Sequence, residues 1–243
     1  MDGIIFRTDS PLSGLENMAV DSACLEDAEE SGRTFTVVRF YQWSSATVSL
    51  GKHQVPARAC DIDFCREQDV PIVHRPTGGR AVLHDQELTY SVVSNDASLF
   101  PLHDLMGTYS IISRALQDGF MRFGIMVSAS SGTRDASASR AERQSPCFSS
   151  PTRHELMVQG RKLAGSAQRR LKRSFLQHGS IPLRVDYEFM AGALGTRAEL
   201  LRTQMIGVNE VRKDDYDLSE LISCLESGFL SLPRNVTRDV DSG

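Results

Sequence analysis

The chain has 243 residues, 40% of them hydrophobic, which is enough for one large domain with a substantial core. Its 27 basic and 31 acidic residues give a net charge of -4, so we expect no nucleic-acid partner and no binding to an anionic membrane. The sequence shows neither a secretory signal nor an apolar run long enough to span a membrane. We therefore expect a cytoplasmic protein whose five scattered cysteines are reduced thiols.

The N-terminal part of the chain predicts a helix followed by several strands. Ser13 and Glu16 have the spacing of a helix-capping box. The apolar stripe expected behind this box consists of Leu15, Met18, Ala19 and Leu25. Strands are predicted over residues 34–43, 46–50, 71–75, 80–84 and 87–93. A short helix is predicted over residues 60–68, and a tight glycine-rich turn over residues 76–79.

The clearest helical period in the chain covers residues 104–124 and stops at Gly124. Its apolar positions are Leu105, Tyr109, Ile112, Leu116, Phe120 and Phe123. Residues 128–146 carry no large apolar side chain and predict a mobile surface loop. Strand patterns then return over residues 154–159, 162–169 and 175–185. A second capping box, Asp217 with Glu220, predicts a final helix with an apolar face at Leu218, Leu221, Ile222, Leu225 and Phe229.

The order of these elements predicts the fold class. Strands and helices do not alternate strictly, and the strands on both sides of the loop at residues 128–146 look like parts of one sheet. We therefore predict an α+β fold with a mixed, largely antiparallel sheet flanked by helices, in a single domain over residues 1–243.

A first candidate site is the sequence RPTGGRAVLHD at residues 75–85. Gly78 and Gly79 follow a strand and allow backbone N–H groups to approach a ligand closely. Arg75 and Arg80 bracket this turn and could bind a phosphate or a carboxylate. The plainer interpretation is a hairpin turn with solvated arginines. The sequence contains no P-loop motif.

A second candidate site combines Cys147 with Lys162. Cys147 follows the predicted loop, where a substrate could reach it, and Lys162 lies on the next strand pattern. A nearby ammonium would favour the thiolate, which is the nucleophilic form of a cysteine. Most single cysteines are packing residues, so these two residues alone would favour a buried cysteine beside a surface lysine.

The third candidate site is the pair His178 and Gly179. A histidine followed by glycine within a strand indicates a close approach to the backbone, although His178 alone is more often a structural histidine than a catalytic base. The histidines and cysteines show no metal-binding spacing. The basic run at residues 169–173 is most often a solvated turn, but it could meet an acidic partner.

In this order, the motifs RPTGGRAVLHD, GRKLAGSAQRR and LQHGSI resemble those of the biotin/lipoate protein ligase superfamily. The resemblance covers about residues 33–232 and implies that family's catalytic-domain fold. The segment CFSSPTRHELMVQGRKLAGSAQ is similar to the cysteine-dependent octanoyltransferases of Gram-positive bacteria. This resemblance implies that Cys147 carries the acyl group as a thioester and that Lys162 favours its thiolate. The substrate-binding residues it implies are Arg75, Gly78, Gly79, Arg80, His84, Gly165, His178 and Gly179.

The resemblance also implies partners and a reaction. The donor is octanoyl-acyl-carrier protein, and the acceptor is the lysine of a lipoyl domain, in the glycine-cleavage H protein or a 2-oxoacid dehydrogenase subunit. We expect a monomer that needs no cofactor and no metal, with Val82 and Leu163 walling the acyl slot. Residues 152–154, less aromatic than expected, and a short C-terminus leave the acceptor open.

Three alternatives stay open. They are an ATP-dependent lipoate-protein ligase, an octanoyl amidotransferase between lipoyl carrier proteins, and a non-catalytic protein that binds carrier domains.

Overall fold

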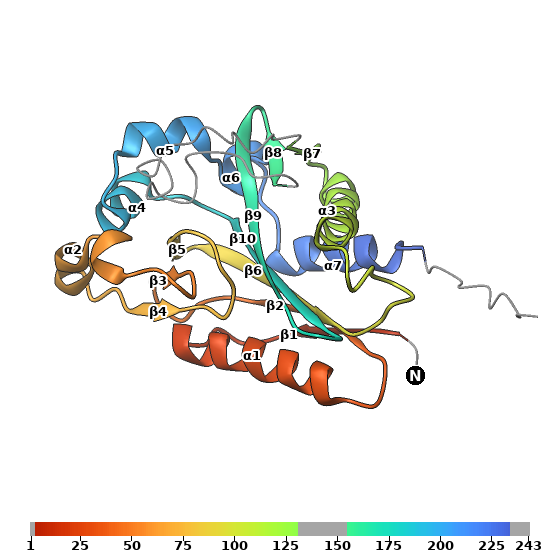
Figure 1. Ribbon diagram of the computed structural model, residues 1–243. Helices are drawn as coiled ribbons and strands as arrows, with labels where there is room; N and C mark the ends of the chain where they lie inside the picture. Colours follow the sequence, from red (N-terminus) through yellow and green to blue (C-terminus); the bar gives the residue numbers. More distant parts are fainter. Residues whose placement is uncertain (1–2, 131–154, 234–243) are drawn as a thin grey trace, which may run out of the picture.

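The computed structural model describes residues 3–130 and 155–233 (Figure 1). Its larger sheet has the strand order β1-β2-β6-β10-β9-β8-β7. The strands of this sheet are β1 (Ile4–Thr8), β2 (Thr36–Tyr41), β6 (Glu87–Ser94), β10 (Phe175–Pro182), β9 (Arg161–Arg170), β8 (Leu156–Val158) and β7 (Ser128–Ala129). A smaller sheet has the order β4-β3-β5, made of β4 (Ile72–His74), β3 (Thr47–Leu50) and β5 (Val82–His84).

The predicted fold class is confirmed. β1 pairs with β2 in parallel and β3 with β4 in parallel, whereas the other ladders of the two sheets are antiparallel. The predicted loop at residues 128–146 begins later than expected, because Ser128 and Ala129 form β7. Residues 131–146 of that loop lie outside the described residues, and so does Cys147. The strand β1 was not predicted.

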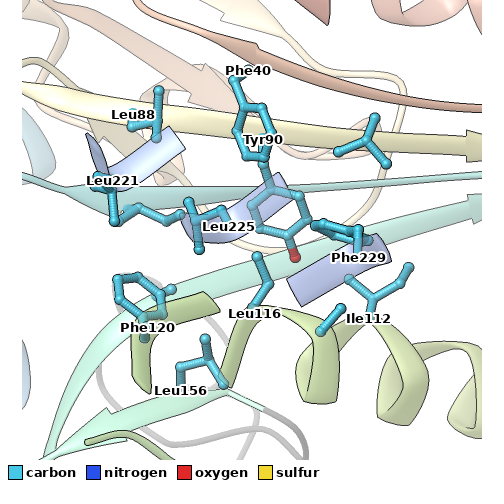
Figure 2. Packing of buried hydrophobic residues seen from close by; sticks show 14 of the residues in the cluster. Phe40, Leu88, Tyr90, Ile112, Leu116, Phe120, Leu156, Leu221, Leu225 and Phe229 are labelled. Carbon is cyan, nitrogen blue, oxygen red and sulfur yellow. The ribbon is translucent and has the colours of Figure 1, made fainter. Parts of the chain in front are cut away.

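Two long helices cover one face of the larger sheet (Figure 1). These are α3 (Leu105–Arg122) and α7 (Leu218–Leu230), whose apolar stripes match the sequence period except at the exposed Leu105. Figure 2 shows the resulting core, in which side chains of both helices pack against Phe40, Leu88 and Tyr90 of the strands. Gly124, with a φ of 87°, ends α3 as predicted, because a left-handed residue suits glycine.

The helix α1 (Gly14–Glu30) packs on the opposite face, where Leu25 meets Val93 and Leu176. Its capping box is confirmed, and of the predicted apolar stripe Met18 and Leu25 are buried, whereas Leu15 and Ala19 are exposed. The buried face of α1 also carries the polar residues Asn17 and Asp21. The reason is that α1 covers polar side chains of the sheet, which need hydrogen-bonding partners.

Short helices complete the fold. They are the 3₁₀ helix η1 (Pro56–Arg58) and the α-helices α2 (Ile62–Glu67), α4 (Tyr187–Leu194), α5 (Ala198–Gln204) and α6 (Val208–Val211). The last three were not resolved by the sequence patterns, and β10 ends at Pro182, before the predicted end at residue 185. Asp217 caps α7 as predicted, but Glu220 pairs with Arg212 instead of closing the box. Within the described residues, no helix is long and apolar enough to cross a membrane.

Candidate active site

The register of the larger sheet separates an apolar face from a polar face. Tyr41, Thr89, Ser180 and Gly165 lie side by side across β2, β6, β10 and β9. Side chains alternate along a strand, so the residues two positions further along each strand project on the same face. These residues are Arg39, Ser91, His178 and Ala167. The residues between the two rows project toward α3 and α7.

A pocket opens on this polar face, bounded by the smaller sheet, the glycine loop of residues 76–79 and α1. Its empty volume is about 560 Å³, which includes space open to solvent at the mouth. The predicted site residues that line it are Arg75, Gly79, His84, Lys162, Gly165, His178 and Gly179. Gly78 belongs to the glycine loop and Arg80 directly follows it, but neither lines the pocket. Val82 lines the pocket as expected, but Leu163 belongs to the core on the other face.

Arg75 holds the glycine loop in place. Its guanidinium donates hydrogen bonds to the carbonyl oxygens of Gly78 (2.8 Å), Arg80 (2.6 Å) and Ser49 (2.9 Å). Gly79 has a φ of 97°, and a Cβ there would lie 2.7 Å from Arg75 Nη2. Both observations explain why this turn needs glycine beside a buried arginine.

His84 is the centre of a buried hydrogen-bond chain. Its Nε2 lies 2.7 Å from Ser49 Oγ, and its Nδ1 lies 2.8 Å from Glu87 Oε1. The ring stacks on Trp43 with 4.0 Å between ring centroids. Burial alone would raise the pKa of Glu87, but the neighbouring His84 and hydroxyl hydrogen bonds hold that pKa below its ordinary value. These hydrogen bonds fix the orientation of the His84 imidazole in the pocket wall.

His178 joins the glycine loop to α1. Its Nε2 lies 2.7 Å from Thr77 Oγ1, and its Nδ1 lies 3.0 Å from Asp21 Oδ2. Burial lowers the pKa of His178 despite the opposing effect of Asp21, so the ring is neutral near pH 7. Asp21 also accepts hydrogen bonds from Arg39 (3.0 Å), Tyr41 (3.0 Å) and Ser91 (2.9 Å).

Lys162 is buried at the β9 end of the pocket. Its Nζ lies 2.6 Å from Glu155 Oε1, and only 4% of Lys162 is exposed. A Cβ on Gly165 would lie 2.6 Å from Nζ and still closer to Cε, so the missing side chain at residue 165 makes the space that the lysine occupies. Lys162 therefore lines the same pocket as Gly79 of the glycine loop and the two histidines.

The chain was compared with known proteins. The model of the lipoyl protein ligase A/B catalytic domain matches residues 13–230. The chain belongs to this family. It is 40% identical over 232 residues to "Octanoyltransferase LipM" of Brevibacillus brevis, covering 90% of this chain and 83% of that one. It is 34% identical to the Staphylococcus aureus protein of that name over 223 residues, covering 88% of this chain and 80% of that one.

Solved structures of lipoate protein ligases share the fold of this chain. The bipartite lipoate protein ligase from Thermoplasma acidophilum superposes with a TM-score of 0.73 at 20% identity, covering 94% of this chain and 82% of that one. A lipoate-protein ligase A bound with ATP gives the same TM-score at 21% identity, covering 94% of this chain and 84% of that one.

Several residues that support this pocket were not predicted from the sequence. Asp21, Glu87 and Glu155 each fix a predicted site residue, and Trp43 and Ser49 support His84. One signal could have indicated the three carboxylates. Each stands at a position of a helix or strand pattern where the side chain is expected to point into the protein interior. The described residues contain no cluster of three or more metal-ligating side chains.

The buried polar groups of the pocket predict how stability depends on pH. The pKa values of His178, Asp21 and Glu87 are lower in the folded protein than their ordinary values. On acidification the unfolded chain therefore binds these protons first, and the free energy of unfolding should decrease from about pH 6.5 downward. Each pKa unit corresponds to about 1.4 kcal/mol.

Urea unfolding between pH 4 and 8 measures this decrease. In His178→Gln, the part of the slope between about pH 6.5 and pH 5 should be smaller. A free energy of unfolding that stays constant from pH 7 to pH 5 in the unmodified protein would contradict the assignment.

Proposed function

We propose that the protein transfers an octanoyl group from octanoyl-acyl-carrier protein, through a thioester on Cys147, to the lysine of a lipoyl domain. The observation that carries this proposal is the pocket, which has Lys162 and the glycine loop at one end and a closed, largely apolar wall at the other. Membership of the lipoyl protein ligase A/B family and the octanoyltransferase relatives support it. The acceptor class is the glycine-cleavage H protein or a 2-oxoacid dehydrogenase subunit, and the enzyme acts as a cytoplasmic monomer.

The part of the sheet beneath the pocket is wider than an extended chain of eight carbons is long. Gly165 and Tyr41 are separated by three strand-to-strand steps, or roughly 14 Å at about 4.8 Å per step. An extended octanoyl chain has seven carbon–carbon bonds of about 1.5 Å, which in zigzag span roughly 9 Å. Met18, Tyr41 and Trp43 are buried and close the far end, whereas Gly79 is exposed at the mouth.

The other cysteines are poorly suited to carry the acyl group. Burial raises the pKa of Cys24 and that of Cys65 to about 11, and it also raises the pKa values of Cys60 and Cys224. None of these four lines the pocket. A thiol with a raised pKa is a poor nucleophile at neutral pH, so Cys147 is the cysteine that the proposal uses.

The reaction has two balanced steps. The Cys147 sulfur attacks the donor's thioester carbonyl, a new carbon–sulfur bond forms, and the donor leaves as a thiol that takes the proton of Cys147. The neutral amine of the acceptor lysine then attacks the acyl-enzyme, an amide forms, and the surplus proton returns to the Cys147 sulfur. Backbone N–H groups near Gly78, Gly79 or Gly165 are the candidate donors to the oxyanion. The donor thioester is already activated, so neither step consumes ATP.

Mass spectrometry tests this proposal. The purified protein is incubated with octanoyl-acyl-carrier protein without ATP, and we expect a mass increase of one octanoyl group. The increase should be lost in Cys147→Ser and retained in the control Cys224→Ser. Addition of a lipoyl domain should then remove the acyl group from the enzyme and place it on the domain.

The same experiment separates the alternatives. Modification of a lipoyl domain that requires free octanoate and ATP, and that survives Cys147→Ser, would identify a ligase instead. Acylation of the enzyme by an octanoyl-lipoyl domain, but not by octanoyl-acyl-carrier protein, would identify an amidotransferase. The absence of any acylation under all three conditions would leave a carrier-domain binder.

A further inference from the structure

The Arg75 guanidinium is engaged by the protein itself. Within the described part of the chain, Arg75 donates five hydrogen bonds, as many as a guanidinium has N–H groups. Nε and Nη2 donate to the Gly78 carbonyl oxygen at 3.1 and 2.8 Å, and Nη2 also donates to that of Arg80 at 2.6 Å. Nη1 donates to the carbonyl and hydroxyl oxygens of Ser49 at 2.9 and 3.1 Å. Arg75 is only 5% exposed, so these bonds form away from water.

Three successive carbonyl groups of the glycine loop point toward this guanidinium or toward the residues that follow β3. The Thr77 carbonyl accepts from the Lys52 N–H at 2.9 Å. The Gly78 carbonyl accepts from the guanidinium. The Gly79 oxygen lies against Gly51, where a Cβ would be only 2.1 Å from it. The carbonyl side of the loop is therefore turned into the protein.

The N–H groups of Gly78 and Gly79 consequently face the other side of the loop. Because the peptide bond is planar and trans, each N–H points opposite to the carbonyl of the preceding residue. Both glycines are exposed, and neither N–H donates a hydrogen bond within the described part of the chain. Gly79 lines the same pocket as Lys162 and Gly165. Successive N–H groups on one side of a loop form a concave site for an anion.

We infer that Arg75 is a positioning residue that turns the Gly78 and Gly79 N–H groups toward the oxyanion formed during acyl transfer. This inference rests on the proposed function, in which a thioester carbonyl becomes that oxyanion. Arg75 acts through the loop, and its charge behind the Gly78 carbonyl polarises the peptide and strengthens the Gly79 N–H as a donor. The alternative role is the one that the sequence suggested, in which Arg75 binds a phosphate or a carboxylate of the substrate.

Arg75→Lys distinguishes these two roles. A lysine keeps the positive charge, but it lacks the planar fork that holds the Gly78 and Arg80 carbonyls together. We expect kcat for octanoyl transfer to fall by about 100-fold or more, as when an oxyanion donor is lost, while KM changes by less than about threefold. The control Arg58→Lys, at an exposed position of η1, should change neither constant. A higher KM with an unchanged kcat, or no change in either, would overturn the inference.

Gly79→Ala breaks the same contact from the side of the loop. Its Cβ would lie 2.7 Å from Arg75 Nη2, at a φ of 97° that suits glycine. We expect kcat to fall by about 100-fold here as well. Because both substitutions disrupt one arrangement, the double variant should be no more than about threefold slower than the slower single variant. Effects that multiply in the double variant would show that the two residues act independently and would contradict the inference.

A second measurement does not depend on catalysis. Octanoate is the probe, because its carboxylate stands in for the oxyanion. In protein labelled with ¹⁵N-glycine, the Gly79 amide signal is assigned by its loss in Gly79→Ala. Octanoate should move this signal to lower field in the unmodified protein and leave it in place in Arg75→Lys. An equal movement in both proteins, or none in the unmodified one, would refute the inference.

The inference and the proposed function fail in different ways. If octanoyl-acyl-carrier protein never acylates the unmodified enzyme, the proposed function is wrong, and the Gly79 amide signal still decides whether Arg75 directs the loop. Thermal unfolding identifies any variant that does not fold. If Arg75→Lys is among them, Gly79→Ala, at an exposed position, supplies the kinetic comparison.

Discussion

Replacing Gly165 with alanine should lower the rate of octanoyl transfer by about 100-fold or more while the protein remains folded. The new Cβ would lie 2.6 Å from Lys162 Nζ and closer still to Cε, so the lysine side chain must leave its position beside the glycine. A displacement of about 1 Å at a catalytic group is enough to cost about 100-fold in rate. Because the obstructing atoms belong to the end of a flexible side chain, the backbone of β9 need not move.

Single-turnover transfer from octanoyl-acyl-carrier protein measures this effect, and circular dichroism verifies the fold. Gly32→Ala is a suitable control, because a Cβ at that position meets no atom within 4 Å. Equal rates for Gly165→Ala and Gly32→Ala would show that the position of Lys162 does not limit the reaction.

Asp21→Asn should reduce the free energy of unfolding by about 3 kcal/mol, the lower end of the cost of breaking a buried ion pair. Asp21 is only 1% exposed and accepts hydrogen bonds from Arg39, Tyr41, Ser91 and His178. An amide nitrogen placed among these groups would be opposed to at least one donor. Arg39 would keep Asp9, 2.6 Å from its Nε, as its remaining carboxylate.

Urea unfolding at pH 7.5 is the appropriate measurement. Asp27→Asn, on the exposed side of the same helix, should change the free energy of unfolding by no more than about 0.5 kcal/mol. If the two variants unfold at the same urea concentration, the polar network does not hold α1 on the sheet.

Much of the fold follows from local sequence patterns. The helices α3 and α7 were predictable because each buries one apolar stripe against one apolar face of the sheet. The helix α1 was also predicted, but only part of its buried face was, because a period of apolar residues does not mark the buried polar positions Asn17 and Asp21. The helices α4 to α6 are too short to show a period.

The site was predictable in its motifs but not in its supporting residues. Gly79, Lys162 and His178 stand in short, recognisable segments, and the structure gathers them in one pocket. Asp21 contacts His178 across 157 positions of the chain, and Ser49 contacts His84 across 35. Such contacts depend on the register of the strands and on where the helices pack, and the spacing of residues within a short motif indicates neither. Glu155 lies only seven positions from Lys162, but the contact between their side chains became visible only in the folded structure.

The helix α1 supports the pocket in two places. Met18 closes the far end, and Asp21, less than one turn later on α1, holds the histidine that anchors Thr77 in the glycine loop. Displacing α1 to lengthen the pocket would therefore also loosen the loop. Redesign for longer acyl chains should shorten the side chain at residue 18 and leave the helix backbone where it is.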